Sequence, residues 1–253
     1  MLYYYQIVNL VYKILNKIDK YCKEWCLQIN IRKTKILIFN KSGKILKETF
    51  SLQGTLLENV QTYKYLGIIF SASGSFCHAR KDLYQRALKA LFKLKGMLGD
   101  IIPKIDTNLH IFDHTIKPIL LYASEIWGTL TSVNDEFENK YEKYEFNTLC
   151  NKFYKYVLGV NKKSTNIAVI GELGRFPYHI DIICSVVKFY QRILDYEHDH
   201  LLHQCLQESK MLSDKGVKTW YNFIFQIKNI LKINLDNCNV DKVRLLLINR
   251  FKS

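Results

Sequence analysis

Two strand-like runs decide the fold: Gln28-Ile-Asn-Ile-Arg-Lys-Thr-Lys-Ile-Leu-Ile-Phe39 and Tyr63-Lys-Tyr-Leu-Gly-Ile-Ile-Phe70. Isoleucine, tyrosine, phenylalanine and threonine are frequent in both, and these residue types favour strands. We predict a buried strand at Ile36–Phe39 and a longer strand over Tyr63–Phe70. A Lys/Thr cluster precedes the first strand, and a Tyr-Leu-Gly step lies inside the second.

The segments beside these runs carry turn signals. Asn40–Gly43 and Ser71–Ser75 combine Gly with short polar residues, which is typical of turns. Thr49–Leu52 and Thr55–Leu57, separated by Gln53-Gly54, are typical of a hairpin with a two-residue turn. A small antiparallel sheet is therefore expected before residue 76.

An amphipathic helix is predicted over residues 6–26, because apolar residues recur there at three- and four-residue spacing. Its expected apolar face comprises Ile7, Leu10, Val11, Ile14, Ile18, Cys22 and Trp25. A surface helix with one apolar face buries that face against the core. We therefore expect this helix to cover the small sheet.

From Phe76 onward the sequence predicts mainly helices. They are expected at residues 76–97 (ended by Gly96 and Gly99), 106–122 (bent near Pro118), 134–158 (ended by Gly159), 167–173 (capped from Ser164–Asn166, stopped by Gly174), 181–196, 219–232 and 240–251. Residues 121–130 favour no single structure. The expected fold class is α+β, with a first domain at residues 1–75 and a helical one at residues 76–253.

The predicted helix at residues 76–97 has two distinct faces. One is apolar and comprises Leu83, Ala87, Ala90, Leu91 and Leu94, while the other is basic and comprises Arg86, Lys89 and Lys93. The basic face belongs to the more strongly charged part of the chain. Residues 1–100 hold 17 Lys and Arg against 6 Asp and Glu, whereas residues 101–253 hold 20 against 17.

The 253-residue chain as a whole has a formal net charge of +14. A basic excess gathered in one part of a chain favours a polyanionic partner such as nucleic acid. A solvated, lysine-rich surface is the alternative interpretation.

The cysteines and the hydropathy pattern indicate the cellular compartment of the protein. Seven scattered cysteines suit a reducing environment and form no disulfide framework. No apolar run reaches the ~18 residues of a membrane span, and the first six residues lack the basic region of a signal peptide. We expect an intracellular protein of the nucleus or cytoplasm with no membrane partner, and the sequence leaves its oligomeric state open.

A series of short blocks resembles one family. The blocks are Tyr21–Trp25, Asn30 with Lys33-Thr34, Tyr63–Ile68, Ser73–Phe76, Pro118–Gly128, Leu158–Val160, Thr165-Asn166 and Gly171–Pro177. Their order and spacing resemble the end of the palm, the thumb and the following region of reverse transcriptases from non-LTR (LINE-type) retrotransposons. The resemblance runs through most of the chain and makes the expected sheet a palm remnant.

The resemblance implies roles for two sites in the palm remnant. Lys33, with Lys35 as the alternative, matches a lysine that the family is thought to use as a general acid near the leaving pyrophosphate. Tyr63 and Tyr65-Leu66-Gly67 match the primer grip, a hairpin that presses on the primer 3′ end, where Gly permits close approach of the backbone. The alternatives are a surface lysine beside a strand and an ordinary core strand.

The resemblance also implies a role for the basic helix at residues 76–97. Residues 76–97 would open the thumb, with Arg86, Lys89 and Lys93 facing the template–primer duplex and contacting phosphates. A solvated basic face is the alternative here.

The metal-binding aspartates of the family have no match. Polymerases of this class place two Mg²⁺ ions on aspartates, and the family's aromatic-Ala-Asp-Asp turn would lie just before residues 6–26. This sequence contains no Asp-Asp pair. We therefore expect no bound metal or other cofactor, and no catalytic residue beyond the Lys33 remnant.

The expected function follows from the lack of a match to the metal-binding aspartates. We expect the C-terminal piece of a retrotransposon polymerase, which binds RNA template and DNA primer but does not polymerise alone. The alternatives are a basic RNA- or DNA-binding module and a non-functional helical remnant.

One further cluster combines potential metal ligands, namely His198, His200, His203 and Cys205. A zinc site needs four ligands in a tetrahedral arrangement. His200, His203 and Cys205 cannot all project from one helical face. We therefore interpret this segment as an exposed polar linker.

Overall fold

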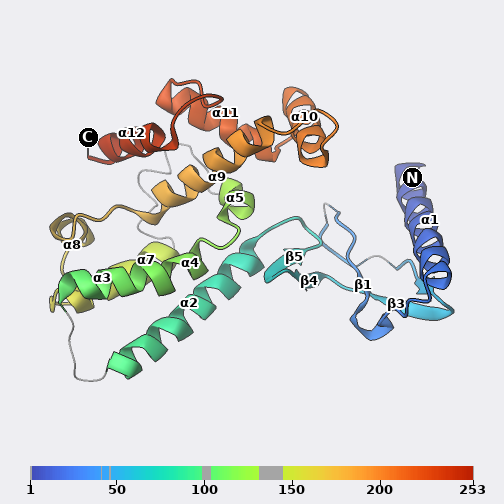
Figure 1. Cartoon of the computed structure of the whole chain (residues 1–253), viewed down its shortest axis with the longest axis horizontal. Helices are drawn as coiled ribbons and strands as arrows, with labels where there is room; N and C mark the ends of the chain where they lie inside the picture. Colours follow the sequence, from blue (N-terminus) through green and yellow to red (C-terminus); the bar gives the residue numbers. More distant parts are fainter. Residues whose placement is uncertain (1, 41, 46, 99–103, 131–144, 253) are drawn as a thin grey trace. The chain divides into compact units, whose positions relative to one another are not determined.

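A computed structural model describes residues 2–40, 42–45, 47–98, 104–130 and 145–252 (Figure 1). The fold is α+β, as predicted, with small sheets near the N-terminus and helices after them. The chain divides into two compact units, Met1–Asp82 and Leu83–Ser253. Each is described by itself.

The described residues of the first unit form two small sheets. The first sheet has the order β1-β3-β2, from strands β1 (Lys35–Ile36), β2 (Phe50–Leu52) and β3 (Thr55–Asn59). β2 and β3 are antiparallel, whereas β1 pairs with β3 in parallel, so this sheet is mixed rather than purely antiparallel. The second sheet is an antiparallel pair, β4 (Thr62–Tyr65) and β5 (Ile68–Ser71).

The β2–β3 hairpin confirms the predicted two-residue turn. Gln53 and Gly54 both have positive φ angles, of 52° and 75°, which is the conformation of a type I′ turn. By contrast, the predicted buried strand at Ile36–Phe39 is wrong: pairing ends at Ile36, and Phe39 is exposed. The chain leaves the sheet there and turns at Asn40, whose carbonyl accepts a hydrogen bond from the Gly43 amide at 3.1 Å.

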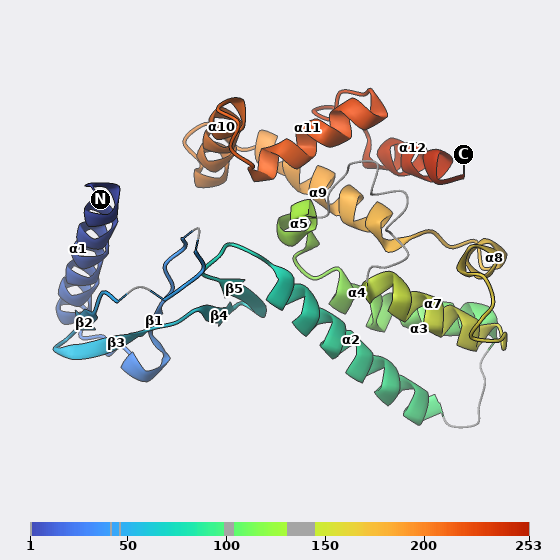
Figure 2. The ribbon, with the colours of Figure 1, turned by 180° about the vertical axis from the view of Figure 1, so that it is seen from behind.

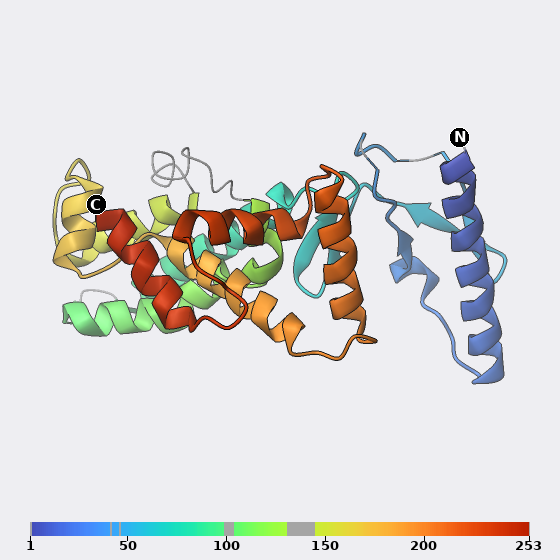
Figure 3. The same ribbon diagram turned by 90° about the horizontal axis from the view of Figure 1, so that it is seen from above.

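Helix α1 (Leu2–Glu24) covers the first sheet, as predicted, but through Leu15 and only part of the expected apolar face (Figures 1 and 3). Leu15 packs with Phe50, Leu52 and Leu57, and Val11 lies at the edge of this cluster. Most of the expected apolar face points to solvent: Leu10, Ile14, Ile18 and Trp25 are exposed. The side chain of Ile7 lies outside the described part of the chain. The helix thus carries two apolar stripes, and the sheet covers one of them.

The second unit is helical, in agreement with the prediction. Its helices are α2 (Cys77–Leu98, which begins in the first unit), α3 (Ile105–Thr115), α4 (Lys117–Leu120), α5 (Ser124–Trp127), the 3₁₀ turn η2 (Gly128–Leu130), α7 (Glu145–Val157), α8 (Asn166–Glu172), α9 (Tyr178–Leu194), α10 (Leu201–Asp214), α11 (Trp220–Leu231) and α12 (Val240–Lys252). Residues 134–144 of the predicted third helix, and Gly99, lie outside the described residues.

The predicted helix ends are only partly correct. Gly159 and Gly174 follow α7 and α8 with positive φ angles of 65° and 60°, as expected for glycine after a helix end. Gly96 does not end its helix, because α2 continues to Leu98. Thr165 is the N-cap of α8, but its side chain makes no capping hydrogen bond.

Helix α9 is the centre of the second unit. It packs against α5, η2, α10, α11 and α12 (Figures 2 and 3). The core contains Ile183, Val187 and Tyr190 of α9 together with Ile224 of α11 and Val243 of α12. At Gly128 the chain approaches α9 so closely that an added Cβ would clash with the Ile182 side chain.

Polar contacts fix the helices around α9. The Asp181 carboxylate of α9 accepts salt bridges from Lys117 of α4 at 2.9 Å and from Arg244 of α12 at 2.5 Å. The Trp220 indole of α11 donates a hydrogen bond to the Glu125 carbonyl of α5 at 3.0 Å. Because these links join helices far apart in the sequence, they define one folded unit.

Candidate nucleic-acid interface

In the β4–β5 hairpin, strand β4 is exposed along its whole length. Tyr65 pairs with Ile68, so Leu66 and Gly67 form a two-residue turn with φ angles of 47° and 83°. The predicted single strand over Tyr63–Phe70 is therefore wrong. The type I′ turn reverses the chain at a Leu-Gly pair, although Asn-Gly or Asp-Gly is the usual signal.

Every residue of β4 is exposed. Tyr63 and Tyr65 lie on one face of the strand, because side chains alternate, and their exposed fractions are 36% and 57%. Leu66 at the turn is 73% exposed. On the opposite face, the Lys64 ammonium forms a salt bridge with Asp82 at 3.2 Å. The hairpin thus presents two phenol rings and an apolar tip to solvent.

The backbone of Lys33 contacts this hairpin. It belongs to the 3₁₀ turn η1 (Ile31–Lys33), where its amide donates to the Asn30 side chain at 3.2 Å. The Tyr63 hydroxyl donates to the Lys33 carbonyl at 3.3 Å. The Lys33 side chain is exposed, whereas Lys35, the alternative candidate, forms a salt bridge with Glu58 at 2.5 Å. The structure therefore brings Lys33 and Tyr63 together and engages Lys35 elsewhere.

The basic face of α2 lies in the second unit. Lys89 and Lys93 are exposed, and Arg86 is half-buried. Leu83, Ala87 and Leu91 are buried on the apolar face, as predicted.

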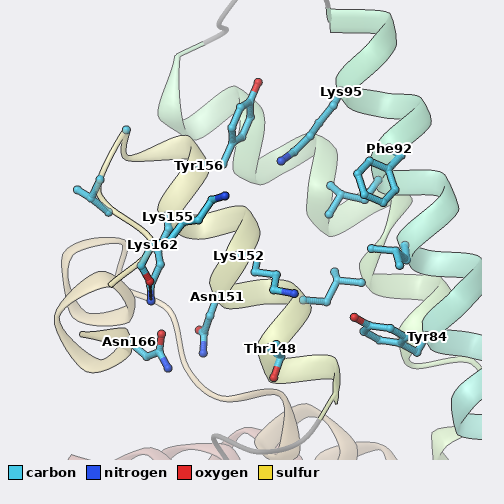
Figure 4. Close-up of a pocket in the computed structure, with 15 residues that line it drawn as sticks. Tyr84, Phe92, Lys95, Thr148, Asn151, Lys152, Lys155, Tyr156, Lys162 and Asn166 are labelled. Atoms are coloured by element: carbon cyan, nitrogen blue, oxygen red, sulfur yellow. Dashed lines mark hydrogen bonds between the residues drawn. The ribbon is translucent and has the colours of Figure 1, made fainter. Parts of the chain in front are cut away.

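A cationic groove, which the sequence pattern does not indicate, lies between α2 and α7 (Figure 4). It is a cavity of about 850 Å³ that also reaches the loop between α7 and α8. Four lysines line it, Lys95 of α2, Lys152 and Lys155 of α7, and Lys162 of the loop. None of the lining residues, all within the described chain, is Asp or Glu.

Aromatic rings alternate with these lysines. The Lys95 ammonium lies 3.9 Å from the centroid of the Tyr156 ring, a cation–π distance. Burial lowers the pKa of Lys95, since the charged form is the one that loses hydration. The Lys155 ammonium donates to the Lys162 carbonyl at 3.0 Å, which ties the loop to α7. In Figure 4, Lys95 points from α2 toward Tyr156, and Lys152 points from α7 toward α2.

The described carboxylates do not converge on a magnesium site. Asp19 pairs with Lys23 within α1 at 2.7 Å, Asp82 pairs with Lys64, and Asp106 lies in the first turn of α3. No three His, Cys, Asp or Glu side chains among the described residues are arranged to hold a metal ion.

The interpretation of this segment as an exposed polar linker is correct for His198 and His200, which are exposed before α10, and wrong for His203, which lies in that helix. Helix α10 begins at Leu201, and His203 is buried. The imidazoles of His198 and His203 are hydrogen-bonded at 3.1 Å, and the Gln207 side chain contacts His203 at 3.1 Å. These side chains form a polar contact within α10 and its preceding turn.

Two known proteins are similar in sequence to part of this chain. One match is a protein of Drosophila melanogaster named as a probable RNA-directed DNA polymerase from transposon BS, 26% identical over 122 residues. A second is an uncharacterized transposon-derived protein of Caenorhabditis elegans, 32% identical over 124 residues. The chain is thus similar to a protein named as a transposon RNA-directed DNA polymerase and to a transposon-derived protein. The resemblance predicted from the sequence is thereby confirmed, at modest identity.

The matches have a limited extent. Each covers 47% of this chain, and the chain spans 14% of the first relative and 43% of the second. No family model and no solved structure matches the chain. Among the described helices, none has both the length and the apolar character needed to cross a membrane.

Proposed function

We propose that this chain is a reverse-transcriptase-like protein that binds template–primer nucleic acid and does not polymerise by itself. The single observation that carries the proposal is the exposure of the whole β4 strand and of Leu66 in the turn after it, at the position that resembles a primer grip. Tyr rings on an exposed strand supply stacking surfaces and hydroxyl donors for a nucleic-acid end.

The hairpin geometry supports close contact with a sugar-phosphate backbone. Gly67 has no Cβ, which removes one steric barrier to a backbone or a phosphodiester that approaches the turn. The Tyr63 hydroxyl links the hairpin to the η1 turn, which presents the exposed Lys33 side chain. A phosphate held near the hairpin would thus meet a cation on the adjacent turn.

The basic face of α2, in the second unit, is proposed as a separate site of phosphate contacts. Lys89 and Lys93 are exposed and one helical turn apart, a spacing that suits contacts to phosphates. Contacts of this kind hold the nucleic acid without selecting a sequence.

Binding is tested by fluorescence anisotropy with a labelled RNA template annealed to a DNA primer. We expect Tyr65→Ala, and separately the pair Lys89→Gln and Lys93→Gln, to weaken binding about tenfold or more. The matched control is Lys215→Gln with Lys218→Gln, which removes the same charge from exposed positions after α10. A template–primer affinity that is equal in all variants would contradict the proposed interface.

The lack of polymerase activity is tested by incubating the chain with primed RNA, deoxynucleotides and Mg²⁺. We expect no primer extension, because the described carboxylates form no metal centre. Any extension above a no-protein control would overturn this part of the proposal.

A further inference from the structure

The α2–α7 groove has a chemistry of its own, separate from the hairpin and from the basic face of α2. Tyr84, Leu88, Leu91 and Lys95 line the groove from α2 at intervals of three and four residues, so they share one side of the helix. By the same periodicity of 100° per residue, Lys89 and Lys93 lie on the opposite side. A substitution in the groove therefore leaves the basic face intact.

The charge of the groove selects an anionic ligand. Its four lysines have no carboxylate beside them in the lining, and like charges in one cavity repel each other. Lys152 and Lys162 are exposed at its rim, while Lys95 is partly buried and lies against the Tyr156 ring. An anion would offset this repulsion along the length of the groove.

The aromatic side chains narrow the class of anion. Phe92 is 65% exposed and Tyr156 is 42% exposed, although both rings belong to a cavity wall. Exposed rings beside lysines are the arrangement that binds unpaired bases, because every base has a face that stacks on an aromatic ring. A duplex keeps its bases stacked internally and cannot offer them to a groove between two helices.

The lining of the groove also contains a buried amide. Asn151 of α7 is 6% exposed, and in Figure 4 it lies on the side of the helix where Asn166 is found. An amide offers both donors and acceptors to the hydrogen-bonding edge of a base. The rim residues are exposed, so a strand longer than the cavity can pass through it.

We infer that the α2–α7 groove binds a single-stranded segment of nucleic acid, with bases against Phe92 and Tyr156 and phosphates on Lys152, Lys155 and Lys162. This inference rests on the proposed function in one respect, since both assign a nucleic-acid ligand. It adds a second site, in the second unit, with a preference for unpaired strands.

The test compares two fluorescein-labelled probes, a 12-nucleotide single-stranded oligouridylate and the template–primer duplex, on the full chain. We expect Lys152→Gln with Lys162→Gln to weaken single-strand binding about tenfold and to reduce the slope of log K against log salt by about 1.4, since each single-strand phosphate contact contributes about 0.7. Tyr156→Ala is expected to cost about fivefold or more through lost stacking. Duplex affinity should stay within about twofold of the Lys215→Gln with Lys218→Gln control.

The outcomes separate this inference from the proposed function. Single-strand binding that matches the control in all groove variants, with unchanged circular dichroism melting, overturns the inference. Equal losses for both probes overturn the preference for single strands, and a poly-glutamate of equal charge that competes as well as the oligonucleotide shows an acidic peptide site instead. If the template–primer fails to bind while groove-dependent single-strand binding persists, the proposed function fails and the inference stands.

Discussion

Leu66 occupies a backbone conformation that its residue type disfavours. Its φ angle of 47° lies in the left-handed region, where a side chain with a Cβ crowds the following carbonyl. The side chain gains little from burial, since it is 73% exposed. A strained, exposed leucine at the tip of a hairpin is consistent with a residue kept for contact rather than for stability.

Replacing Leu66 is expected to change the stability of the chain and its template–primer binding in opposite directions. Leu66→Asn should raise the free energy of unfolding by about 1 kcal/mol, because Asn-Gly is the preferred type I′ pair, while weakening template–primer binding. Urea denaturation and anisotropy measure the two effects. Leu66→Ala is the control, since it removes the side chain but keeps an unfavourable turn residue. A lower urea midpoint for Leu66→Asn would show that the leucine stabilises the turn.

His179 makes the stability of the second unit sensitive to acid. Burial lowers the pKa of this imidazole to about 4, although nearby Asp181 acts in the opposite direction. In the unfolded chain the pKa is near 6.5, so the unfolded state takes up a proton first as the pH falls. The stabilisation is complete above pH 6.5 and is lost between pH 6.5 and pH 4.

This titration predicts a measurable loss. Between pH 7 and pH 5, His179 should reduce the free energy of unfolding by roughly 2 kcal/mol. In His179→Asn that part of the pH dependence should disappear, whatever the variant's absolute stability. Urea midpoints at four pH values, for both proteins, give the comparison. Parallel pH profiles would refute the assignment to His179.

At the level of elements, α1 shows that neighbouring apolar residues have different functions in the fold. Leu15 is buried against the sheet, whereas Ile14 is 47% exposed. Leu15→Ala is expected to lower the free energy of unfolding by about 3 kcal/mol, and Ile14→Ala by less than about 0.5 kcal/mol. Thermal denaturation of both variants tests this. Comparable losses in the two variants would mean that the outer stripe is also covered.

The same helix marks a limit of prediction from sequence. Periodicity identified a helix here, because apolar residues recur every three or four positions. It could not decide which of two apolar stripes faces the sheet, since both satisfy the same spacing. The stripe through Val11 and Leu15 meets Phe50 and Leu52, and that choice depends on the strands rather than on the helix itself.

The two hairpins also differ in how well the sequence predicts their turns. Gln53-Gly54 was recognised because Gly follows a polar residue between two short strands. Leu66-Gly67 was missed because a leucine in a left-handed turn is rare, and the surrounding residues favour one continuous strand. The positions of Tyr63 and Tyr65 on an exposed face emerge only once that turn is known.

At the scale of the molecule, the two units have cores of unequal size. The first unit buries a small cluster around Leu15 and Phe50, whereas the second buries a much larger one along α9, α11 and α12. Local stability follows the buried apolar contacts of each region. We therefore expect the backbone amides of β2 and β3 to exchange with solvent at lower urea concentration than those of α9. Native-state hydrogen exchange measures this, and a single common urea dependence would contradict it.

The groove between α2 and α7 forms only when the two helices pack together in the folded unit. Lys95 and Lys152 are 57 positions apart, and nothing in either helix indicates the other as its neighbour. The sequence pattern therefore indicates a basic face on α2, at Arg86, Lys89 and Lys93, and not the cavity that Lys95 and the lysines of α7 line. The fold class and most helices were predictable from local patterns, but a site made by tertiary packing was not.

Helix α2 also has an electrostatic consequence. Its groove face and its basic face are separated by the width of one helix, about 10–12 Å with side chains. The Debye length is about 8 Å at physiological ionic strength and about 30 Å at 0.01 M. Two strands held on opposite faces would repel each other through the helix in dilute buffer and be nearly independent in the cell. Ionic strength would thus set whether the two ligands exclude each other.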